Sequence, residues 1–388
     1  MTGRAACVLI VSSSAVLAQP TLTHKDVFRA GVGGYHSYRI PAIVTAADGS
    51  LIAFAEARRD NRGDPGSGDI DLVTSRSEDN GGTWSEMRVV DDPGEKWAAS
   101  NPTPLADRSN GRLWLFYNRW EPGFGTDRSR PGTRNNQMWA RSSEDYGRTW
   151  SAPRDLTPSS RDYDHWAAMF TGPGGAIQTR SGRLMIPAAM KHDAYSVAGS
   201  IGGFTGSIGM MRAYVLFSDD HGQSWKRGAL VPALTNENQL VELADGAVLM
   251  DARQNSGDHR WLVTSADGGE TWSRPRPGQA LTPVATSIER FTLQSAGADR
   301  DRLIWTGPTG PGRKNLVARL SYDEGETWMS ERVLYGGLAS YSDATVLRDG
   351  TAGVLWERGV SEAVQYITFT RFNREFLEQA GTVTPRFR

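Results

Sequence analysis

The chain has 388 residues, and its 43 Lys and Arg residues balance 44 Asp and Glu residues, for a formal net charge of −1. With no basic stripe in the sequence, this balance argues against nucleic acid as a partner. The single cysteine, Cys7, excludes a disulfide framework and a cysteine-based metal site. The six histidines are scattered without metal-ligand spacing, so we expect no metal and no cofactor.

The first twenty residues, MTGRAACVLIVSSSAVLAQP, resemble a secretory signal. Arg4 precedes an apolar run, and the small residue Ala18 stands before Gln19, which predicts cleavage of residues 1–18. The protein would then be secreted or periplasmic. Three serines at 12–14 interrupt the apolar run, so an apolar N-terminal strand or a loose extension is the alternative. No other apolar run is long enough to span a bilayer.

A short pattern, Ser-x-Asp-x-Gly-x-Thr/Ser-Trp, occurs five times and follows a strand-like run each time. The copies lie at 77–84, 143–150, 218–225, 265–272 and 321–328. Its Asp can accept hydrogen bonds from the N–H groups of its own turn, its Gly can take a positive φ, and its Trp can fold back over the hairpin. Because a catalytic group is needed only once, the repeat predicts a structural unit, a β-hairpin closed by a fixed turn.

Five hairpins with a leading and a closing segment fit an all-β fold, a six-bladed β-propeller of four-stranded antiparallel blades. We expect the repeated turns on the blade rims, away from the axis. Only NREFLEQA, 373–380, predicts a short helix. No linker interrupts the pattern, so residues 19–388 are predicted to form one domain, and we expect a monomer.

The residues that occur once carry a family resemblance. YRIP, 38–41, precedes the five boxes, and this order resembles the bacterial exo-α-sialidases (neuraminidases), which have a RIP motif and repeated Asp boxes. Further matching segments are GDIDLV (68–73), FTGPGGAIQ (170–178), NENQLVEL (236–243), RKNLVARLS (313–321) and YSDATVL (341–347). The resemblance covers roughly residues 25–370. It implies a retaining enzyme that hydrolyses terminal α-ketosidic sialic acid on glycoproteins, glycolipids or oligosaccharides.

Matching positions imply a cluster of arginines for the substrate. Arg39, Arg253 and Arg313 correspond to the three arginines that hold the sialic acid carboxylate, and a guanidinium fork fits that group bidentately. Arg58 matches the residue on the ring-hydroxyl side. Glu357 matches the buried carboxylate that orients Arg39.

The resemblance also implies an unusual nucleophile. Tyr341 matches the family's nucleophilic tyrosine, a recognised exception among retaining glycosidases. A free phenol has a pKa near 10 and needs an adjacent base. Glu237 matches that base, and Glu242 is the competing candidate. We prefer Glu237 because it precedes Arg253 by 16 residues, a typical family separation.

The acid/base is predicted in the Gly- and Pro-rich stretch between Arg58 and the next strand. Asp64 follows Arg39 by 25 residues, as is typical of the family, and lies in a stretch suited to a loop that closes over substrate. Asp60 is the alternative, whereas Asp69 and Asp71 look structural.

Some assignments stay open. Trp166, Phe170 and Asn101 are candidates for the acyl or aglycone side of the site, without an assigned role. A trans-sialidase or an intramolecular trans-sialidase would have the same site, and a non-catalytic glycan-binding propeller would have the same boxes.

Overall fold

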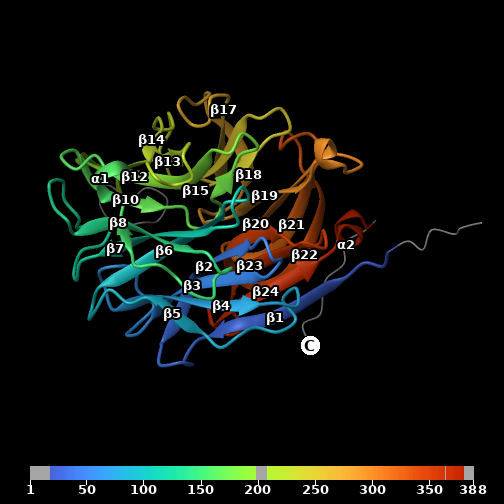
Figure 1. Ribbon diagram of the computed structural model, residues 1–388, viewed down its shortest axis with the longest axis horizontal. Helices are drawn as coiled ribbons and strands as arrows, with labels where there is room; N and C mark the ends of the chain where they lie inside the picture. Colours follow the sequence, from blue (N-terminus) through green and yellow to red (C-terminus); the bar gives the residue numbers. More distant parts are fainter. Residues whose placement is uncertain (1–17, 198–207, 363, 380–388) are drawn as a thin grey trace, which may run out of the picture.

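The computed structural model describes residues 18–197, 208–362 and 364–379. The predicted signal, including Cys7, lies outside them except for Ala18, so its cleavage stays a prediction. The described part has 24 strands, the helices α1 (Thr157–Ser160) and α2 (Arg374–Glu378) and the 3-10 helix η1 (Gln294–Ala296) (Figure 1). The predicted all-β class is confirmed, and neither of these two α-helices is long or apolar enough to cross a membrane.

The strands form antiparallel groups of four that follow one another along the chain. The first two groups are β2 (Ser37–Thr45), β3 (Leu51–Arg58), β4 (Ile70–Ser77), β5 (Arg88–Asp91), and β6 (Ala98–Ala106), β7 (Leu113–Trp120), β8 (Asn136–Ser143), β9 (Arg154–Asp155). A single parallel bridge between Ile70 and Ala98 joins them into one eight-stranded sheet. The third group is β10 (Trp166–Thr171), β12 (Leu184–Val197), β13 (Ile208–Ser218), β14 (Lys226–Arg227), with β11 (Ile177–Gln178) on β12.

Of the remaining groups, the fifth and the sixth share one long strand. The fourth group is β15 (Thr235–Glu242), β16 (Val248–Gln254), β17 (His259–Ser265), β18 (Arg276–Ala280), and the fifth is β19 (Ser287–Thr292), β20 (Arg302–Pro308), β21 (Lys314–Ser321), β22 (Met329–Val346). The first half of β22 pairs with β21 and its second half with β23 (Ala352–Arg358). The sixth group therefore contains the end of β22, then β23, β24 (Tyr366–Phe372) and β1 (Leu22–Arg29).

The apolar core lies between consecutive groups. Strand β3, LIAFAEAR, is buried along its whole length because its alternating side chains face two neighbours. Ile52 and Phe54 cluster with Leu115 of the second group, whereas Ala53 clusters with Leu355 of the sixth. The sixth group thus packs on the first. The closed six-bladed arrangement itself stays a prediction.

The five turns share one hydrogen-bond pattern. In the first, the carboxylate of Asp79 accepts the N–H and hydroxyl of Thr83 at 2.8 and 2.7 Å and the Ser77 hydroxyl at 2.9 Å. Gly81 has φ +86°, and a Cβ on it would lie 2.0 Å from the Phe369 ring, so only glycine fits. The matching bonds of the other four turns involve Asp145, Asp220, Asp267 and Asp323.

The tryptophans of these turns join neighbouring groups. Trp84 makes an edge contact with Phe369 of β24, and Trp225 makes one with Phe116 of β7, at centroid distances of 5.3 and 5.1 Å. Phe369 belongs to the sixth group, which packs on the first, and Phe116 belongs to the second group, which precedes the third. The boxes therefore tie one sheet to the next, which agrees with their predicted structural role.

The first strand completes the last group. Strand β1 pairs antiparallel with β24, so the blue N-terminal strand lies beside the red C-terminal strands in Figure 1. Asn373 caps α2 by accepting the N–H of Phe376 at 3.1 Å and also accepts the N–H of Thr21 at 2.8 Å. The helix predicted at 373–380 is thus present as α2.

Candidate active site

A cavity of about 350 Å³ is lined by residues near the starts of β2 and β15 and by Tyr341 in the second half of β22. Seven of the eight predicted site residues line it: Arg39, Arg58, Asp64, Glu237, Arg253, Arg313 and Tyr341. The eighth, Glu357, lies behind Arg39. The fold therefore brings together residues that are up to 302 positions apart between Arg39 and Tyr341.

Tyr341 on β22 is hydrogen-bonded to the predicted base. Its hydroxyl donates to Oε1 of Glu237 at 2.5 Å, and Nη1 of Arg253 donates to the same hydroxyl at 3.0 Å. Arg253 also donates to the other oxygen of Glu237, which fixes that carboxylate. Burial and the charge of Glu237 raise the pKa of Tyr341, while the three neighbouring arginines act in the opposite direction. A buried phenol of this kind becomes a nucleophile only as it passes its proton to a base.

Glu357 on β23 holds the Arg39 side chain and the adjacent backbone of β2 in place. It is fully buried, and its two oxygens accept Nε and Nη2 of Arg39 at 3.0 and 3.3 Å. The backbone of β2 shifts register after Arg39, and Ile40 has φ +56°, which lets its N–H reach Glu357 at 3.0 Å. Although burial opposes ionisation, the charge and hydrogen bonds of Arg39 hold the pKa of Glu357 below its ordinary value.

Arg313, between β20 and β21, completes a ring of positive charge. It donates to the Ser340 hydroxyl at 3.2 Å and to the Pro283 carbonyl at 3.4 Å. Its guanidinium carbon and that of Arg39 each lie 5.4 Å from the centroid of the Tyr341 ring. Within the described part of the chain no carboxylate lies in ion-pair range of Arg313. Its charge is therefore available to an anionic ligand beside Tyr341.

Asp64 lies on the loop after β3 and faces the cavity. Its side chain is 79% exposed, and its Oδ1 lies 3.2 Å from Arg58 Nη1 and 3.6 Å from Arg39 Nη1. By contrast, Asp60 is exposed outside the cavity and accepts the N–H of Asp69 at 3.2 Å. The placement favours Asp64 over Asp60 as a proton donor to a bound ligand.

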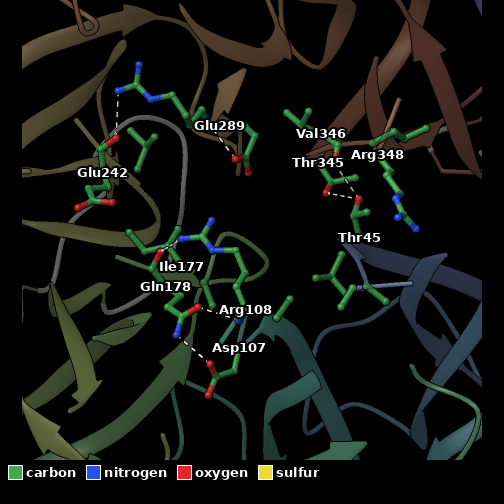
Figure 2. A pocket seen from close by; sticks show the side chains of 18 of the residues that line it. Thr45, Asp107, Arg108, Ile177, Gln178, Glu242, Glu289, Thr345, Val346 and Arg348 are labelled. Carbon is green, nitrogen blue, oxygen red and sulfur yellow. Dashed lines mark hydrogen bonds between the residues drawn. The ribbon is translucent and has the colours of Figure 1, made fainter. Parts of the chain in front are cut away.

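Glu242, the alternative base, lies elsewhere. It lines a separate cavity of about 520 Å³ and accepts the N–H of Arg180 at 2.8 Å (Figure 2). This far-end cavity also holds Thr45, the last residue of β2, and Thr345, the last but one of β22. The first cavity holds Arg39 near the start of β2 and Tyr341, four residues before Thr345. Glu242 is therefore at the wrong end of β15 to receive the Tyr341 proton.

Several site residues escaped sequence reasoning. Glu56 on β3 is buried and holds Arg58 through bonds of 2.6 and 3.1 Å, and burial raises the pKa of Glu56. Its position two residues before Arg58 puts both side chains on one face of the strand, a signal that was available. Asn236 on β15 and Asn255, just after β16, also line the cavity, and their local sequence carries no such signal.

The three residues without an assigned role separate into two sets. Asn101 and Phe170 line the cavity. Trp166 does not, because its ring packs in the core at 5.2 Å from the Tyr214 ring and under Arg227. Across the described residues, no group of three His, Cys, Asp or Glu side chains is arranged to hold a metal ion.

Comparisons with known proteins identify the family of the chain. Residues 49–354 match the family model described as BNR repeat-like domain. The sialidase of Micromonospora viridifaciens is 32% identical over 92% of this chain, and that of Bacteroides fragilis is 28% identical over 86%. The chain spans only 55% and 63% of the lengths of these two relatives.

A solved structure shares the fold. The structure of a Hadza microbial sialidase superimposes with a TM-score of 0.79 at 27% identity and covers 90% of this chain and 68% of its own. Because the family model matches most of the sequence, the chain belongs to the BNR repeat-like domain family, and the relatives it resembles there are sialidases.

Proposed function

We propose that this protein is a retaining exo-α-sialidase that releases terminal α-ketosidic sialic acid from glycoproteins, glycolipids or oligosaccharides. One observation carries the proposal: a buried tyrosine hydroxyl, Tyr341, donates to Glu237 at 2.5 Å between arginines. A hydroxyl paired with a carboxylate base is a nucleophile ready for activation. The arginines select a substrate whose reacting carbon bears a carboxylate.

The arginines explain why a neutral nucleophile is used. Arg39, Arg253 and Arg313 would hold the substrate carboxylate, which is attached to the anomeric carbon itself. A carboxylate nucleophile would approach that group with like charge, whereas the phenol of Tyr341 arrives neutral. The burial that raises the pKa of Tyr341 keeps it neutral until the reaction.

The reaction then proceeds in two balanced steps. Asp64 gives its proton to the leaving glycosidic oxygen as the Tyr341 oxygen bonds to the anomeric carbon and its proton passes to Glu237. In the second step Asp64, now ionised, takes a proton from water as the water oxygen attacks that carbon. The bond to Tyr341 breaks, and Glu237 returns the proton to the phenol. Two inversions retain the α configuration, and no metal or cofactor is needed.

We also propose that the six strand groups close into a six-bladed β-propeller within one domain, residues 19–388. Support comes from the core clusters between consecutive groups and from the packing of the sixth group on the first. On this proposal Arg39 belongs to a RIP motif and the five turns are Asp boxes. The signal-like pattern of residues 1–18 supports a secreted or periplasmic location, and we propose a monomer.

Product analysis tests the activity directly. Proton NMR of a sialyllactose digest should show α-sialic acid first, followed by its slow conversion to the β anomer. An anhydro-sugar product would indicate an intramolecular trans-sialidase, and sialic acid moved to added lactose would indicate a trans-sialidase. Binding without any product would indicate a glycan-binding propeller, and each of these results would overturn the hydrolase.

A further inference from the structure

A second cross-group hydrogen bond repeats the Tyr341–Glu237 bond one step deeper along the same two strands. Asp343 follows Tyr341 by two positions on β22, and Gln239 follows Glu237 by two positions on β15. Residues two apart share a face of a strand. Nε2 of Gln239 donates to Oδ1 of Asp343 at 2.9 Å, and each residue is only 2% exposed.

Residues on other strands also bond to this pair, and their hydrogen bonds fix which atoms of Asp343 and Gln239 donate and which accept. Oδ2 of Asp343 accepts the N–H of Ile43 on β2 at 2.8 Å. Oε1 of Gln239 accepts the hydroxyl of Ser287 on β19 at 2.8 Å. A Cβ on Gly174 would lie 2.5 Å from the Asp343 carboxylate, so the backbone of that loop lies directly against it. Each oxygen and the amide nitrogen of the pair therefore has a defined donor or acceptor role.

The Asp343–Gln239 bond joins the two strands directly, and Ser287 joins them a second time, because its hydroxyl donates to Gln239 and accepts the N–H of Ala344 on β22 at 2.9 Å. Strands β15 and β22 belong to different sheets, so no ladder of backbone bonds joins them. We propose that Asp343 and Gln239 are positioning residues, whose hydrogen bond holds β22 against β15 so that the Tyr341 hydroxyl stays within reach of Glu237. The kinetic part of this inference rests on the proposed sialidase activity.

A reciprocal exchange tests the pair. Asp343→Asn turns an amide toward the amide of Gln239 or toward the N–H of Ile43, so one donor loses its acceptor. Gln239→Glu places a second carboxylate against Asp343. In the double variant the new amide donates to the new carboxylate, which still accepts from Ser287. Only the longer bond from Gln239 Nε2 to the Pro173 carbonyl, at 3.3 Å, is not restored. A displacement of about 1 Å in a reacting group costs on the order of 10²-fold in rate.

We therefore expect each single substitution to lower kcat on sialyllactose by roughly 10²-fold, with a much smaller change in KM, and the double variant to recover to within about tenfold of wild type. Burial raises the pKa of Asp343 to about 7 against the effect of its hydrogen bonds, so the kinetics are compared above that pH. There both carboxylate oxygens accept.

Asp107→Asn is the matched control. Asp107 is fully buried and accepts Nε2 of Gln178 at 2.8 Å, in the same kind of Asp–Gln pair across two groups, but in the far-end cavity (Figure 2). This variant should lose thermal stability without the specific loss of kcat. An equal loss of kcat in Asp107→Asn and Asp343→Asn, or no recovery in the double variant, would reduce Asp343 to a general structural role and overturn the proposal.

Crystal structures of the variants give a readout that needs no substrate. The distance from Tyr341 Oη to Glu237 Oε1 should exceed the hydrogen-bond range of about 3.0 Å in Asp343→Asn and return to it in the double variant. If the wild type released sialic acid from no sialoside, the proposed function would fail, and this distance would still decide the positioning role. An unchanged distance overturns it.

Ser287→Ala covers the case in which Asp343→Asn does not fold. It removes a hydroxyl that donates to Gln239 Oε1 and accepts the N–H of Ala344 on β22, at a site 1% exposed. We expect a fall in kcat of several-fold, by about 1 kcal/mol for one neutral hydrogen bond, and a longer Tyr341–Glu237 distance. Unchanged kcat and distance in this variant would contradict the proposal.

Discussion

Arg313 differs from the other arginines of the cavity because its charge has no carboxylate partner among the described residues. Arg39 is paired with Glu357 and Arg253 with Glu237. Arg313 is held only by a hydroxyl and a carbonyl. Without ligand, the Arg313 guanidinium is held only by neutral groups. It should therefore gain more interaction energy from a ligand carboxylate than Arg39 or Arg253, which already have ion-pair partners.

Arg313→Ala should weaken catalysis without unfolding the protein. Loss of one partner of a desolvated charge pair costs about 2 to 5 kcal/mol, which lowers kcat/KM on sialyllactose by roughly 30- to several-thousand-fold. Arg39→Ala should be at least as severe and should also lower Tm, because it leaves the buried Glu357 unpaired. Kinetics and thermal unfolding measure both effects, and near-normal kcat/KM in either variant contradicts the assignment.

Asp64→Ala should show a defect that depends on the leaving group. A sugar alkoxide needs a proton to leave, so the rate on sialyllactose should fall by about 10²- to 10⁴-fold. An aryl sialoside of 4-methylumbelliferone needs far less help and should keep much of its sialylation rate. The basic limb of the pH profile on sialyllactose should weaken as well.

Asp60→Ala is the control for this experiment, since Asp60 lies on the same loop but outside the cavity. It should affect both substrates equally or neither. A leaving-group-dependent defect in Asp60→Ala and not in Asp64→Ala would transfer the acid role to Asp60. Normal behaviour of both variants would place the acid outside this loop.

At the scale of the elements, the repeated turns depend on an ionised carboxylate. Hydrogen bonds lower the pKa of Asp220 to about 2, the largest effect coming from the Ser224 hydroxyl, then from the Ser224 N–H and the Ser218 hydroxyl. An unfolded Asp has a pKa of about 3.9. Because the pKa of Asp220 is lower in the folded state than in the unfolded state, the ionised carboxylate stabilises the folded protein. This stabilisation is complete above about pH 4 and is lost as the pH falls through about 2.

Asp220→Asn should therefore lower Tm most at mildly acidic to neutral pH, and the difference from wild type should shrink as the pH falls below about 4. Thermal unfolding across this range measures it. Asp164→Asn, on the exposed segment before β10, is the control and should show no such convergence. A Tm difference for Asp220→Asn that is independent of pH would show that its charge does not stabilise the turn.

At the scale of the whole molecule, the N-terminal strand is part of the last sheet. Strand β1 pairs with β24 over its length, and Asp26 accepts Nη2 of Arg358 on β23 at 2.6 and 2.8 Å. A chain that begins at Gln19, the predicted mature start, should keep the Tm of the full chain, because it retains β1 and the bonds of Gln19 and Thr21 to Asn373. A chain that begins at Gly31 loses β1 and should unfold at markedly lower temperature or fail to fold.

Circular dichroism melts of these two truncations measure the difference. Asp26→Ala in the full chain separates the ion pair from the strand itself, because it keeps the β1–β24 pairing. Arg358 is only 9% exposed, and Asp26 also accepts the Thr368 hydroxyl, so Asp26→Ala should lower Tm, but by less than the loss of the whole strand. Equal Tm values for the chains beginning at 19 and 31 would show that β1 does not close the fold.

Local sequence was sufficient to predict structure and site residues where a short pattern fixes the backbone geometry or matches a position of the sialidase family. The turn boxes predicted hairpins because their Asp, Gly and Trp act within one turn. Arg39, Glu237 and Tyr341 were assigned by position, and the structure brings them together. Asp343, Gln239 and the pairing of β1 with β24 were not predicted, because each contact joins segments more than 100 residues apart and leaves no local pattern.

The pairing of β1 with β24 also bears on where the chain needs to be continuous. The side chain of Asn373 donates to the carbonyl of Gln19 at 2.7 Å, so the two ends of the described chain meet at the base of α2. A short linker from 379 to 19 would make the molecule a covalent circle. Opening that circle in the loop between β14 and β15 would interrupt no described strand pair, because these two strands belong to different sheets. The result would be a circular permutant whose new ends lie between the third and fourth groups. The backbone order that places Arg39 first and Tyr341 last is therefore one of several that can build the same cavity.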